Sequence, residues 1–330
     1  MPRTLLVAPS WIGDAVLSHP LLVRLKEGDP SGSIDVLAPP WVLPVYRRMP
    51  EVSGMHMLPF GHGDLRLRER RLFAKGLPRY DRAVILPNTL KSALIPWHAG
   101  IPVRTGWRGE MRYGLVNDLR VLDEAALPLI VERYAALAQP AGEALRRPLP
   151  DPRLAVDPAE RAAVLAKHGL DTSRPVAAFA PGAEYGPAKR WPPRHFARLA
   201  QDLHARNYSV WLFGSGKDAG ITAEIQRLSN ALCVDLAGRT SLDEAIALLS
   251  LAARVVSNDS GLMHVAAALD RPMAALFGSS SPAFTPPLSA KARVISLGLA
   301  CSPCFARTCP LGHTNCLETL DPADVLNTLH

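Results

Sequence analysis

Residues 4–14 read TLLVAPSWIGD, a short apolar run followed by a turn that contains Gly13 and then by Asp14. The run predicts a buried strand at residues 4–8, and Gly13 allows a tight turn into a helix. Similar apolar runs alternate with helical patterns along the rest of the chain. That alternation indicates an α/β fold in which helices cover both faces of a parallel sheet.

The alternating pattern occurs in two halves of similar size. We expect strands at residues 4–8, 34–37, 55–58, 83–86, 176–180, 210–213, 254–256, 273–277 and 293–296. We expect helices around residues 14–27, 40–49, 65–76, 91–99, 158–169, 193–206, 218–229, 242–252 and 261–269. The first helix should kink or restart at Pro20, which has no N–H to donate.

Prolines cluster between residues 140 and 158, where apolar periodicity is weak, and this is typical of a connection between domains. The length of 330 residues fits two domains, which we place at residues 1–150 and 151–330. We therefore expect two doubly wound, Rossmann-like domains that face a central cleft. Ligands should bind at the carboxyl ends of the strands.

The composition is that of a globular protein, with 48% apolar and 20% charged residues. No apolar run reaches the length of about 18 residues that a membrane-spanning helix needs. The apolar segment at the N-terminus is too short for a secretory signal peptide. We therefore expect a cytoplasmic protein.

Basic side chains are concentrated in the first half of the chain. Residues 1–150 contain 20 lysines and arginines against 14 acidic residues, whereas residues 151–330 contain 17 against 16. Residues 66–82 alone carry seven: Arg66, Arg68, Arg70, Arg71, Lys75, Arg79 and Arg82. They form either a solvated helix face or a surface for an anionic lipid or a phosphorylated glycan. Nucleic acid fits least, because only 6% of the residues are aromatic and the chain has no nucleic-acid-binding motif in which basic and aromatic residues interleave.

Asp14 follows the first expected strand and opens the first helix. An aspartate at this position commonly caps the helix. A carboxylate at the mouth of a cleft is also suited to act as a general base. The position of Asp14 alone does not separate the two interpretations.

The loop PGAEYGPAKRWP at residues 181–192 follows another expected strand. It carries Gly182, Lys189 and Arg190, and a glycine-rich loop with two cations can clamp a diphosphate. It is not a Walker A loop, because Lys189 is followed by Arg190 rather than by serine or threonine. An ordinary surface loop is the alternative.

Two further loops follow strands of the second half. Residues 258–264 read NDSGLMH, and backbone N–H groups at such a helix start could hold a phosphate, although an N-cap with a packed histidine is the alternative. Gly214 begins a Gly-Ser-Gly turn, and Asp218 after it could bind ribose hydroxyls or cap the next helix.

The second half therefore offers three loops suited to a nucleotide diphosphate, and the first offers a carboxylate and a basic surface. This division is typical of a glycosyltransferase with a donor domain and an acceptor domain. One alternative is a nucleotide-sugar epimerase, which needs no acceptor. Another is a binding protein for a nucleotide sugar or a lipid headgroup. If Asp14 and Lys189 lie on opposite sides of one cleft, they argue against this second alternative.

Four of the five cysteines lie within 16 residues, with His313 among them. They are Cys301, Cys304, Cys309 and Cys316, in the spacing C-x2-C-x4-C-x6-C. The spacing resembles a compact zinc site, and disulfides are disfavoured in a reducing compartment. A structural zinc ion, an iron–sulfur cluster and a reduced cysteine-rich loop are the alternatives.

Long strings of the chain resemble the ADP-heptose:lipopolysaccharide heptosyltransferases of glycosyltransferase family 9. They include PSWIGDAVLSHPLL at 9–22, RMPEV at 48–52, GHGDLRLRERR at 61–71, LPNTLKSALIP at 86–96, AGIPVRTGWRGEMRYGLVND at 99–118, PGAEYGPAKRWP at 181–192, NDSGLMHVAAALDRP at 258–272 and SSSPAFTPPLS at 279–289. Within the family, the string RTGWRGEMRYG favours the members that add the second heptose, heptosyltransferase II, over those that add the first.

The resemblance implies a GT-B fold of two Rossmann-like domains. It implies an inverting, metal-independent transfer of L-glycero-D-manno-heptose from ADP-heptose to the first inner-core heptose of lipopolysaccharide. The acceptor is anionic and lipid-anchored, so the resemblance also implies a peripheral position at the cytoplasmic face of the inner membrane. Other heptosyltransferases of the family, which differ in acceptor, are the nearest alternatives.

The resemblance also implies roles for individual residues. Asp14 matches the family's proposed base, and Lys189 matches the cation near the leaving ADP. The donor-binding positions, together with those expected from the loops, are Gly182, Arg190, Gly214, Asp218, Asp259, Ser260, Gly261, Leu262 and His264. Asp218 stands where relatives have a glutamate beside the ribose. The candidate acceptor contacts, taken from the basic strings of the first half, are Asn88, Lys91, Arg104, Arg108 and Arg112.

Overall fold

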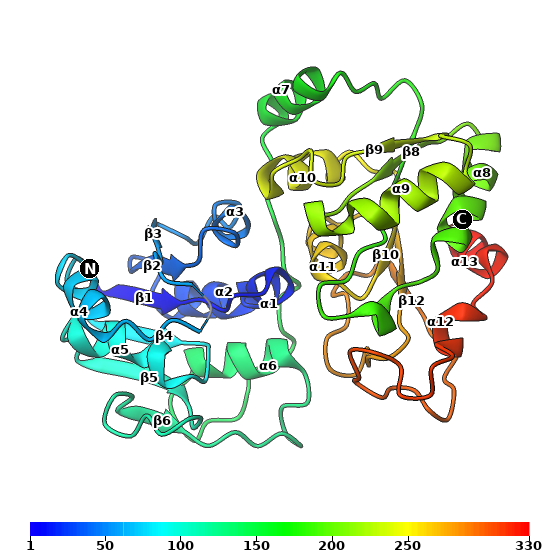
Figure 1. Cartoon of the computed structure of the whole chain (residues 1–330). Coiled ribbons are helices and arrows are strands. Elements are labelled where there is room, and N and C mark those ends of the chain that lie inside the picture. Colours follow the sequence, from blue (N-terminus) through cyan, green and yellow to red (C-terminus); the bar gives the residue numbers. More distant parts are fainter. Residues whose placement is uncertain (62, 330) are drawn as a thin grey trace. The chain divides into compact units, whose positions relative to one another are not determined.

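The computed structural model describes residues 1–61 and 63–329. The chain divides into two compact units, Met1–Pro152 and Arg153–His330, and each contains one six-stranded parallel sheet flanked by helices (Figure 1). The division lies close to the expected one at residue 150. Across the described ranges, no helix is long and apolar enough to span a membrane.

The sheet of the first unit has the strand order β3-β2-β1-β4-β5-β6. Its strands are β1 (Arg3–Val7), β2 (Ser33–Ala38), β3 (Gly54–Met57), β4 (Arg82–Ile85), β5 (Val103–Trp107) and β6 (Asp118–Arg120). Its helices are α1 (Ile12–Leu17), α2 (His19–Gly28), α3 (Leu43–Tyr46), α4 (Leu67–Lys75), α5 (Leu90–His98) and α6 (Ile130–Ala135), followed by a 3-10 helix, Ala136–Ala138.

The sheet of the second unit has the order β12-β11-β10-β7-β8-β9. Its strands are β7 (Val176–Ala180), β8 (Ser209–Leu212), β9 (Cys233–Asp235), β10 (Arg254–Asn258), β11 (Met273–Leu276) and β12 (Ala292–Ile295). Its α-helices are α7 (Pro158–His168), α8 (Pro193–Ala205), α9 (Ala219–Leu228), α10 (Leu242–Leu249), α11 (Gly261–Ala268), α12 (Asn315–Glu318) and α13 (Pro322–Thr328), with 3-10 helices at Pro187–Lys189 and Gly216–Asp218.

Both sheets follow the doubly wound order 3-2-1-4-5-6 when their strands are counted within each unit. The strand order reverses between β1 and β4 in the first unit and between β7 and β10 in the second. In such sheets, ligands bind where the order reverses, outside the carboxyl ends of the strands. The expected α/β class is confirmed.

The first helix divides where the sequence predicts a kink or a restart. α1 ends at Leu17, and α2 begins at His19 with Pro20 in its first turn. Oγ of Ser18 donates a hydrogen bond to the carbonyl of Ala15 at 2.7 Å. The proline is tolerated because the first turn of a helix does not need its N–H.

Three strands were not predicted. They are β5 (VRTGW), β6 (DLR) and β9 (CVD). β6 and β9 are three residues long and lie at the edges of their sheets, and β5 contains an arginine and a glycine. Short or polar strands give a weak hydrophobic signal, and here the neighbouring strand determines the backbone conformation.

Candidate active site

Lys189 and Asp259 form an ion pair in the second unit. Lys189 ends the 3-10 helix after β7, and Asp259 directly follows β10, which pairs with β7. Nζ of Lys189 lies 2.5 Å from Oδ2 of Asp259, which is buried. The same Nζ lies 5.1 Å from the centre of the Tyr185 ring. Two loops expected to bind a donor thus meet at the point where the strand order reverses.

Asn258 fastens these two loops to each other. Its side chain is fully buried, and its Oδ1 accepts a hydrogen bond from the N–H of Trp191 at 3.0 Å. Its Nδ2 donates to the carbonyl of Pro181 at 2.7 Å. Both ends of the loop that carries Lys189 are therefore attached to the last residue of β10, which limits the positions that the ammonium can occupy.

His264 lies one turn into α11 and is buried. Burial is the main cause that lowers its pKa to about 4; the charge of Asp259 opposes this shift and that of Lys189 adds to it. The imidazole is therefore neutral near pH 7, and its Nδ1 has no hydrogen-bond partner among the described residues. A neutral ring with one open nitrogen suits a hydroxyl or a base edge better than a phosphate.

The start of α11 carries Ser260, Gly261 and Leu262. Ser260 occupies the N-cap position with an extended backbone, yet within the described part of the chain its side chain makes no capping hydrogen bond. Its Oγ lies 3.3 Å from Oγ of Ser257 instead. The first N–H groups of a helix lack intrahelical acceptors, so those of Gly261 and Leu262 are placed to receive an anion.

Gly182, Gly214 and Asp218 come together after β7 and β8. A Cβ added to Gly182 would lie 2.4 Å from Oδ1 of Asp218, and one added to Gly214 would lie 2.8 Å from its Cβ. Only glycine allows this approach. Oδ2 of Asp218 accepts from the N–H and Oγ of Ser215 at 2.9 and 2.8 Å. Asp218 thus closes a capping box of the 3-10 helix Gly216–Asp218, whereas at the N-cap of α9 its side chain makes no capping hydrogen bond to a described residue. Its contact with ribose stays a prediction.

The side chain of Arg190 contacts the loop to which it belongs, residues 181–192. Its Nη2 donates to the carbonyl of Ala183 at 3.2 Å. Its guanidinium therefore closes the 181–192 loop next to Lys189. A direct contact between Arg190 and a donor stays a prediction.

In the first unit, Asp14 lies in the first turn of α1, near two buried tyrosines. Burial is the main cause that raises the pKa of Tyr46 and of Tyr134, and the charge of Asp14 adds to both shifts. Tyr46 belongs to α3 and Tyr134 to α6. Two helices of the first unit, α3 and α6, thus bring neutral phenol groups close to the carboxylate on α1.

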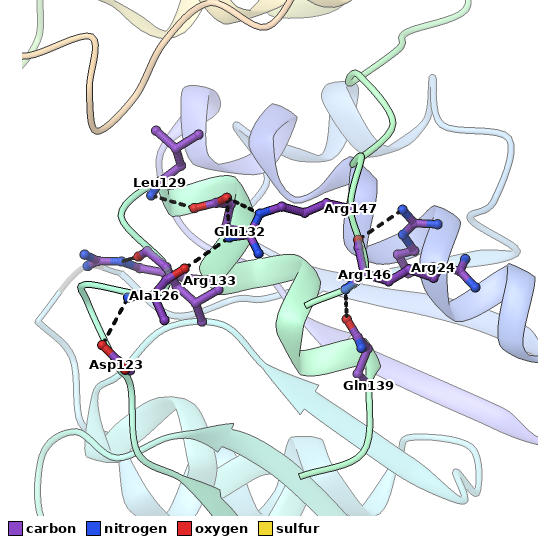
Figure 2. A network of polar contacts seen from close by, with 10 residues as sticks. Arg24, Asp123, Ala126, Leu129, Glu132, Arg133, Gln139, Arg146 and Arg147 are labelled. Atoms are coloured by element: carbon purple, nitrogen blue, oxygen red, sulfur yellow. Dashed lines mark hydrogen bonds and ion pairs between the residues drawn. The ribbon is translucent and has the colours of Figure 1, made fainter. Parts of the chain in front are cut away.

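Figure 2 shows the polar contacts that hold α6 in this position. Oε1 of Glu132 lies 2.7 Å from Nη2 of Arg147. Arg24 of α2 donates to the carbonyl of Arg146 at 3.3 Å. α6 packs against α1 and α2, so the network fixes the helix that carries Tyr134.

Asn88, Lys91 and Arg108 gather at the carboxyl ends of β4 and β5. Asn88 follows β4, Lys91 lies in the first turn of α5, and Arg108 follows β5. A Cβ added to Gly109 would lie 2.4 Å from the carbonyl oxygen of Asn88, so the two loops are in direct contact. Asn88 and Arg108 are exposed and Lys91 is half-buried. The structure thus places three of the expected acceptor residues on two adjoining loops.

Arg112 contacts this group from the protein interior. It is 1% exposed, and burial lowers its pKa. Its Nη2 donates to Oδ1 of Asn88 at 3.0 Å and to the carbonyl of Trp107 at 2.6 Å, and its Nη1 donates to the carbonyl of Pro87 at 2.7 Å. Because the protein encloses the guanidinium, we interpret Arg112 as a positioning residue for Asn88.

Arg104 lies apart from this group, and its contact with an acceptor stays a prediction. Arg104 is the second residue of β5, so it lies toward the amino end of the strand, whereas Asn88 and Arg108 follow carboxyl ends. Its Nε donates to the carbonyl of Leu115 at 2.6 Å and its Nη2 to that of Gly114 at 3.2 Å. The side chain holds the loop before β6.

These residues can be compared with known proteins. Residues 70–315 match the model of glycosyltransferase family 9 (heptosyltransferase), which covers well over half of the chain. The chain belongs to glycosyltransferase family 9. It is 49% identical to lipopolysaccharide heptosyltransferase 2 of Salmonella typhimurium over 99% of this chain and 97% of that protein. It is 52% identical to the enzyme of the same name from Escherichia coli over 89% of this chain and 88% of that protein.

Solved structures agree with this assignment. The family 9 glycosyltransferase superposes on E. coli ADP-heptose lipopolysaccharide heptosyltransferase II with a TM-score of 0.90 and 47% identity, over 99% of this chain and 97% of that one. E. coli heptosyltransferase WaaC with ADP shares the fold at 21% identity, with a TM-score of 0.72 over 98% of both chains. The expected GT-B fold class and the assignment as a glycosyltransferase enzyme are confirmed.

Two serines of this glycosyltransferase were not predicted as site residues. Ser279 and Ser280 follow β11, the neighbour of β10, and are buried. Their hydroxyls have no hydrogen-bond partner within residues 1–61 and 63–329. They lie at the same edge of the sheet as Asp259, so we add them to the candidate donor site. The signal in the sequence is the run of three serines that follows an expected strand after a single glycine, Gly278.

No group of three or more histidine, cysteine or acidic side chains in the described residues is arranged to hold a metal ion. The cysteine-rich segment, residues 301–316, contains free thiols. The expected structural zinc at Cys301, Cys304, Cys309 and Cys316 is therefore not preformed.

Proposed function

We propose that this enzyme transfers L-glycero-D-manno-heptose from ADP-heptose to the first inner-core heptose of lipopolysaccharide, with inversion at the anomeric carbon. The observation that supports it most is the donor edge of the second sheet. There Lys189 pairs with Asp259. Nδ1 of His264 and the hydroxyls of Ser279 and Ser280, on segments that follow β10 and β11, have no hydrogen-bond partner among the described residues. The near-full-length similarity to lipopolysaccharide heptosyltransferase 2 supports the choice of donor and acceptor.

The donor role follows from charge and burial. A diphosphate needs a cation and N–H donors, which Lys189 and the start of α11 supply. An arriving diphosphate would compete with Asp259 for the ammonium, so the carboxylate holds Lys189 in place until the donor binds. The neutral His264 and the two serine hydroxyls suit uncharged hydroxyls of the nucleotide sugar. The turn at Gly182, Gly214 and Asp218 remains the proposed place of the ribose.

The proposed transfer is a single displacement. The acceptor hydroxyl attacks the anomeric carbon of the heptose, and Asp14 takes the hydroxyl proton. The bond from the anomeric carbon to the diphosphate oxygen breaks, and ADP leaves with the electron pair while Lys189 neutralises its charge. Acid–base help on one side and charge stabilisation on the other are sufficient, so the step needs no metal or other cofactor.

The proposed acceptor contacts are Asn88, Lys91 and Arg108. Two exposed or half-buried cations and an amide on adjoining loops suit a glycan that carries acidic groups. Arg112 orients Asn88 and keeps the two loops together. Nucleic acid is not a proposed partner.

The proposed location is the cytoplasmic face of the inner membrane, with peripheral contact through α4. Leu65, Leu67 and Leu72 are 46%, 52% and 60% exposed, on or beside this helix. Arg66, Arg68, Arg71, Lys75 and Arg79 are exposed in the same stretch. Exposed leucines among cations favour the interface of an anionic membrane. Arg70 is an exception, since it is buried and donates to the carbonyls of Leu65 and Asp64 at 2.7 and 2.8 Å.

The test is to measure ADP release from ADP-heptose with two acceptors. One is Kdo2-lipid A, and the other is the same molecule carrying one heptose. Release only with the heptosylated acceptor is the expected result. Release with the bare Kdo acceptor would instead identify an enzyme that adds the first heptose. No release with either acceptor would overturn the proposal, and conversion of ADP-heptose without any acceptor would indicate an epimerase.

A further inference from the structure

The four clustered cysteines line one cavity, and the proposed sugar transfer assigns no role to their thiols. Ser279 of the proposed donor site lines the same cavity. The four cysteines are Cys301, Cys304, Cys309 and Cys316. No disulfide joins them, and Cys301 and Cys304 are exposed while Cys309 and Cys316 are half-buried. Side chains that are up to 15 positions apart in the sequence are thus directed to a common space.

The backbone turns sharply after Cys309. The N–H of Gly312 donates to the carbonyl of Cys309 at 3.1 Å, and Gly312 has a φ of +73°. Leu311, His313 and Thr314, from the same turn, line the cavity beside Cys309 and Cys316. The turn between these two cysteines therefore forms part of the cavity wall.

Four thiols around one cavity form a ligand set made of sulfur alone. A divalent metal ion that prefers sulfur binds cysteines as thiolates and releases the thiol protons to solvent.

The cysteine-rich segment is fastened to the loops of the donor site. The N–H of Phe305 donates to the carbonyl of Ser279 at 2.7 Å, and the carbonyl of Phe305 accepts from the hydroxyl of Tyr185 at 2.8 Å. The carbonyl of Arg307 accepts from the N–H of Ala188 at 3.1 Å. Ala188 immediately precedes Lys189, so the segment supports the loop that holds the ammonium.

We infer that Cys301, Cys304, Cys309 and Cys316 bind one structural zinc ion as four thiolates, and that this ion holds the cysteine-rich segment against the loop that carries Lys189. Zinc favours a tetrahedral set of four sulfur ligands at about 2.3 Å. In the described arrangement the sulfurs line the cavity without converging to that distance, so binding draws them inward. His313 is not required, because its Nδ1 already accepts from the N–H of Asn315 at 3.0 Å.

The first experiment is metal analysis of untagged protein purified under reducing conditions without chelator. We expect about one equivalent of zinc in the wild type, and a loss of about tenfold or more in Cys309→Ser and Cys316→Ser. Cys233→Ser is the matched control, since Cys233 is buried in β9 and is not among the cavity residues, and should keep the metal. One equivalent of iron in place of zinc would overturn the choice of metal.

A second measurement uses only wild-type protein, so its result does not depend on whether a variant folds. Chelator-treated wild-type protein is titrated with cobalt(II), which should produce the thiolate-to-cobalt charge-transfer absorption of a tetrahedral sulfur site. Hydrogen exchange at residues 182–190 should slow when metal is restored. Wild-type protein with less than about a tenth of an equivalent of metal and no such absorption would overturn the inference. Neither readout requires heptose transfer, so the inference and the proposed function can fail separately.

Discussion

At the scale of single residues, the site depends on polar groups that the fold pairs or buries. Lys189 pairs with the buried Asp259, and burial keeps His264 neutral near pH 7. Asp14 has two neutral phenols nearby. Each arrangement prepares a group for one part of the transfer: charge neutralisation, contact with a neutral hydroxyl, or proton removal.

The substitution Asp14→Asn keeps the size of the side chain and removes its ability to take a proton. We expect turnover to fall by about 10²-fold or more, with little change in the KM for ADP-heptose. Steady-state ADP release checks this. Glu143→Gln, at an exposed carboxylate of the same unit, is the control and should retain wild-type rates. Near-normal turnover of Asp14→Asn would remove Asp14 as the base.

The substitution Lys189→Met removes the ammonium and leaves Asp259 as an unpaired buried carboxylate. Without charge neutralisation at the leaving diphosphate, kcat/KM should fall by an amount that corresponds to a few kcal/mol of lost transition-state stabilisation. Lys217→Met is the matched control, because that lysine also neighbours the donor loop but pairs with the exposed Glu184. An unchanged rate for Lys189→Met would transfer the role to Arg190.

His264 makes stability depend on pH. The pKa of His264 is about 4 in the folded protein and near its ordinary value of 6.5 in the unfolded chain. Below pH 6.5 the unfolded chain therefore binds a proton that the folded protein does not. The free energy of unfolding should fall as the pH drops from 6.5 to about 4, by a few kcal/mol in total.

Denaturant unfolding at pH 7 and pH 5 checks the effect of His264. The substitution His264→Gln should make the loss between these two values smaller. His313→Gln, at an exposed histidine, should leave the wild-type loss unchanged. An equal loss in all three proteins would assign the pH dependence to other groups.

At the scale of elements, the donor site is made of loops that follow neighbouring strands. The loops after β7, β10 and β11 carry Lys189, Asp259 and Ser279. The apolar runs predict these strands well, because strands buried on both faces are continuously hydrophobic. The sequence does not predict β6 and β9, because edge strands of three residues contain no continuous hydrophobic run.

Asn258 joins two of these loops, so its removal should affect both. The substitution Asn258→Ala leaves the N–H of Trp191 and the carbonyl of Pro181 without their partner in a buried place. We expect the free energy of unfolding to fall by about 2–4 kcal/mol. Denaturant unfolding measures this, and hydrogen exchange should rise at residues 181–191. Asn327→Ala, at an exposed asparagine of α13, should change neither quantity.

At the scale of the whole molecule, charge is unevenly divided between the two units. The net charge of the chain is +7, and most of the excess lies before residue 150. The basic stretch, residues 66–82, contains arginines in two kinds of environment. Arg70 is buried and donates hydrogen bonds to backbone carbonyls, whereas Arg68 and Arg71 are exposed beside Leu67 and Leu72.

The exposed arginines and leucines of this stretch predict membrane binding through α4. Wild-type protein should sediment with vesicles that contain phosphatidylglycerol and much less with vesicles of phosphatidylcholine alone. The double substitution Arg68→Glu with Arg71→Glu should weaken binding about tenfold or more, since each basic residue near an anionic surface contributes about 1 kcal/mol. Arg239→Glu with Arg293→Glu makes the same change of net charge in the second unit. Equal binding of the two double variants would place the contact elsewhere.

The sequence by itself determined the class of fold, most strands and helices, and the loops that could bind a donor. These features depend on local patterns: apolar runs, glycine turns and long family strings. Only the tertiary structure decided which polar side chains meet. It paired Lys189 with Asp259, enclosed Arg112 against Asn88 and placed Arg104 near the amino end of β5. It also left the hydroxyls of Ser279 and Ser280 without partners among the described residues. The reason is physical: burial and hydrogen-bond partners depend on contacts between residues far apart in the chain, and no local pattern records them.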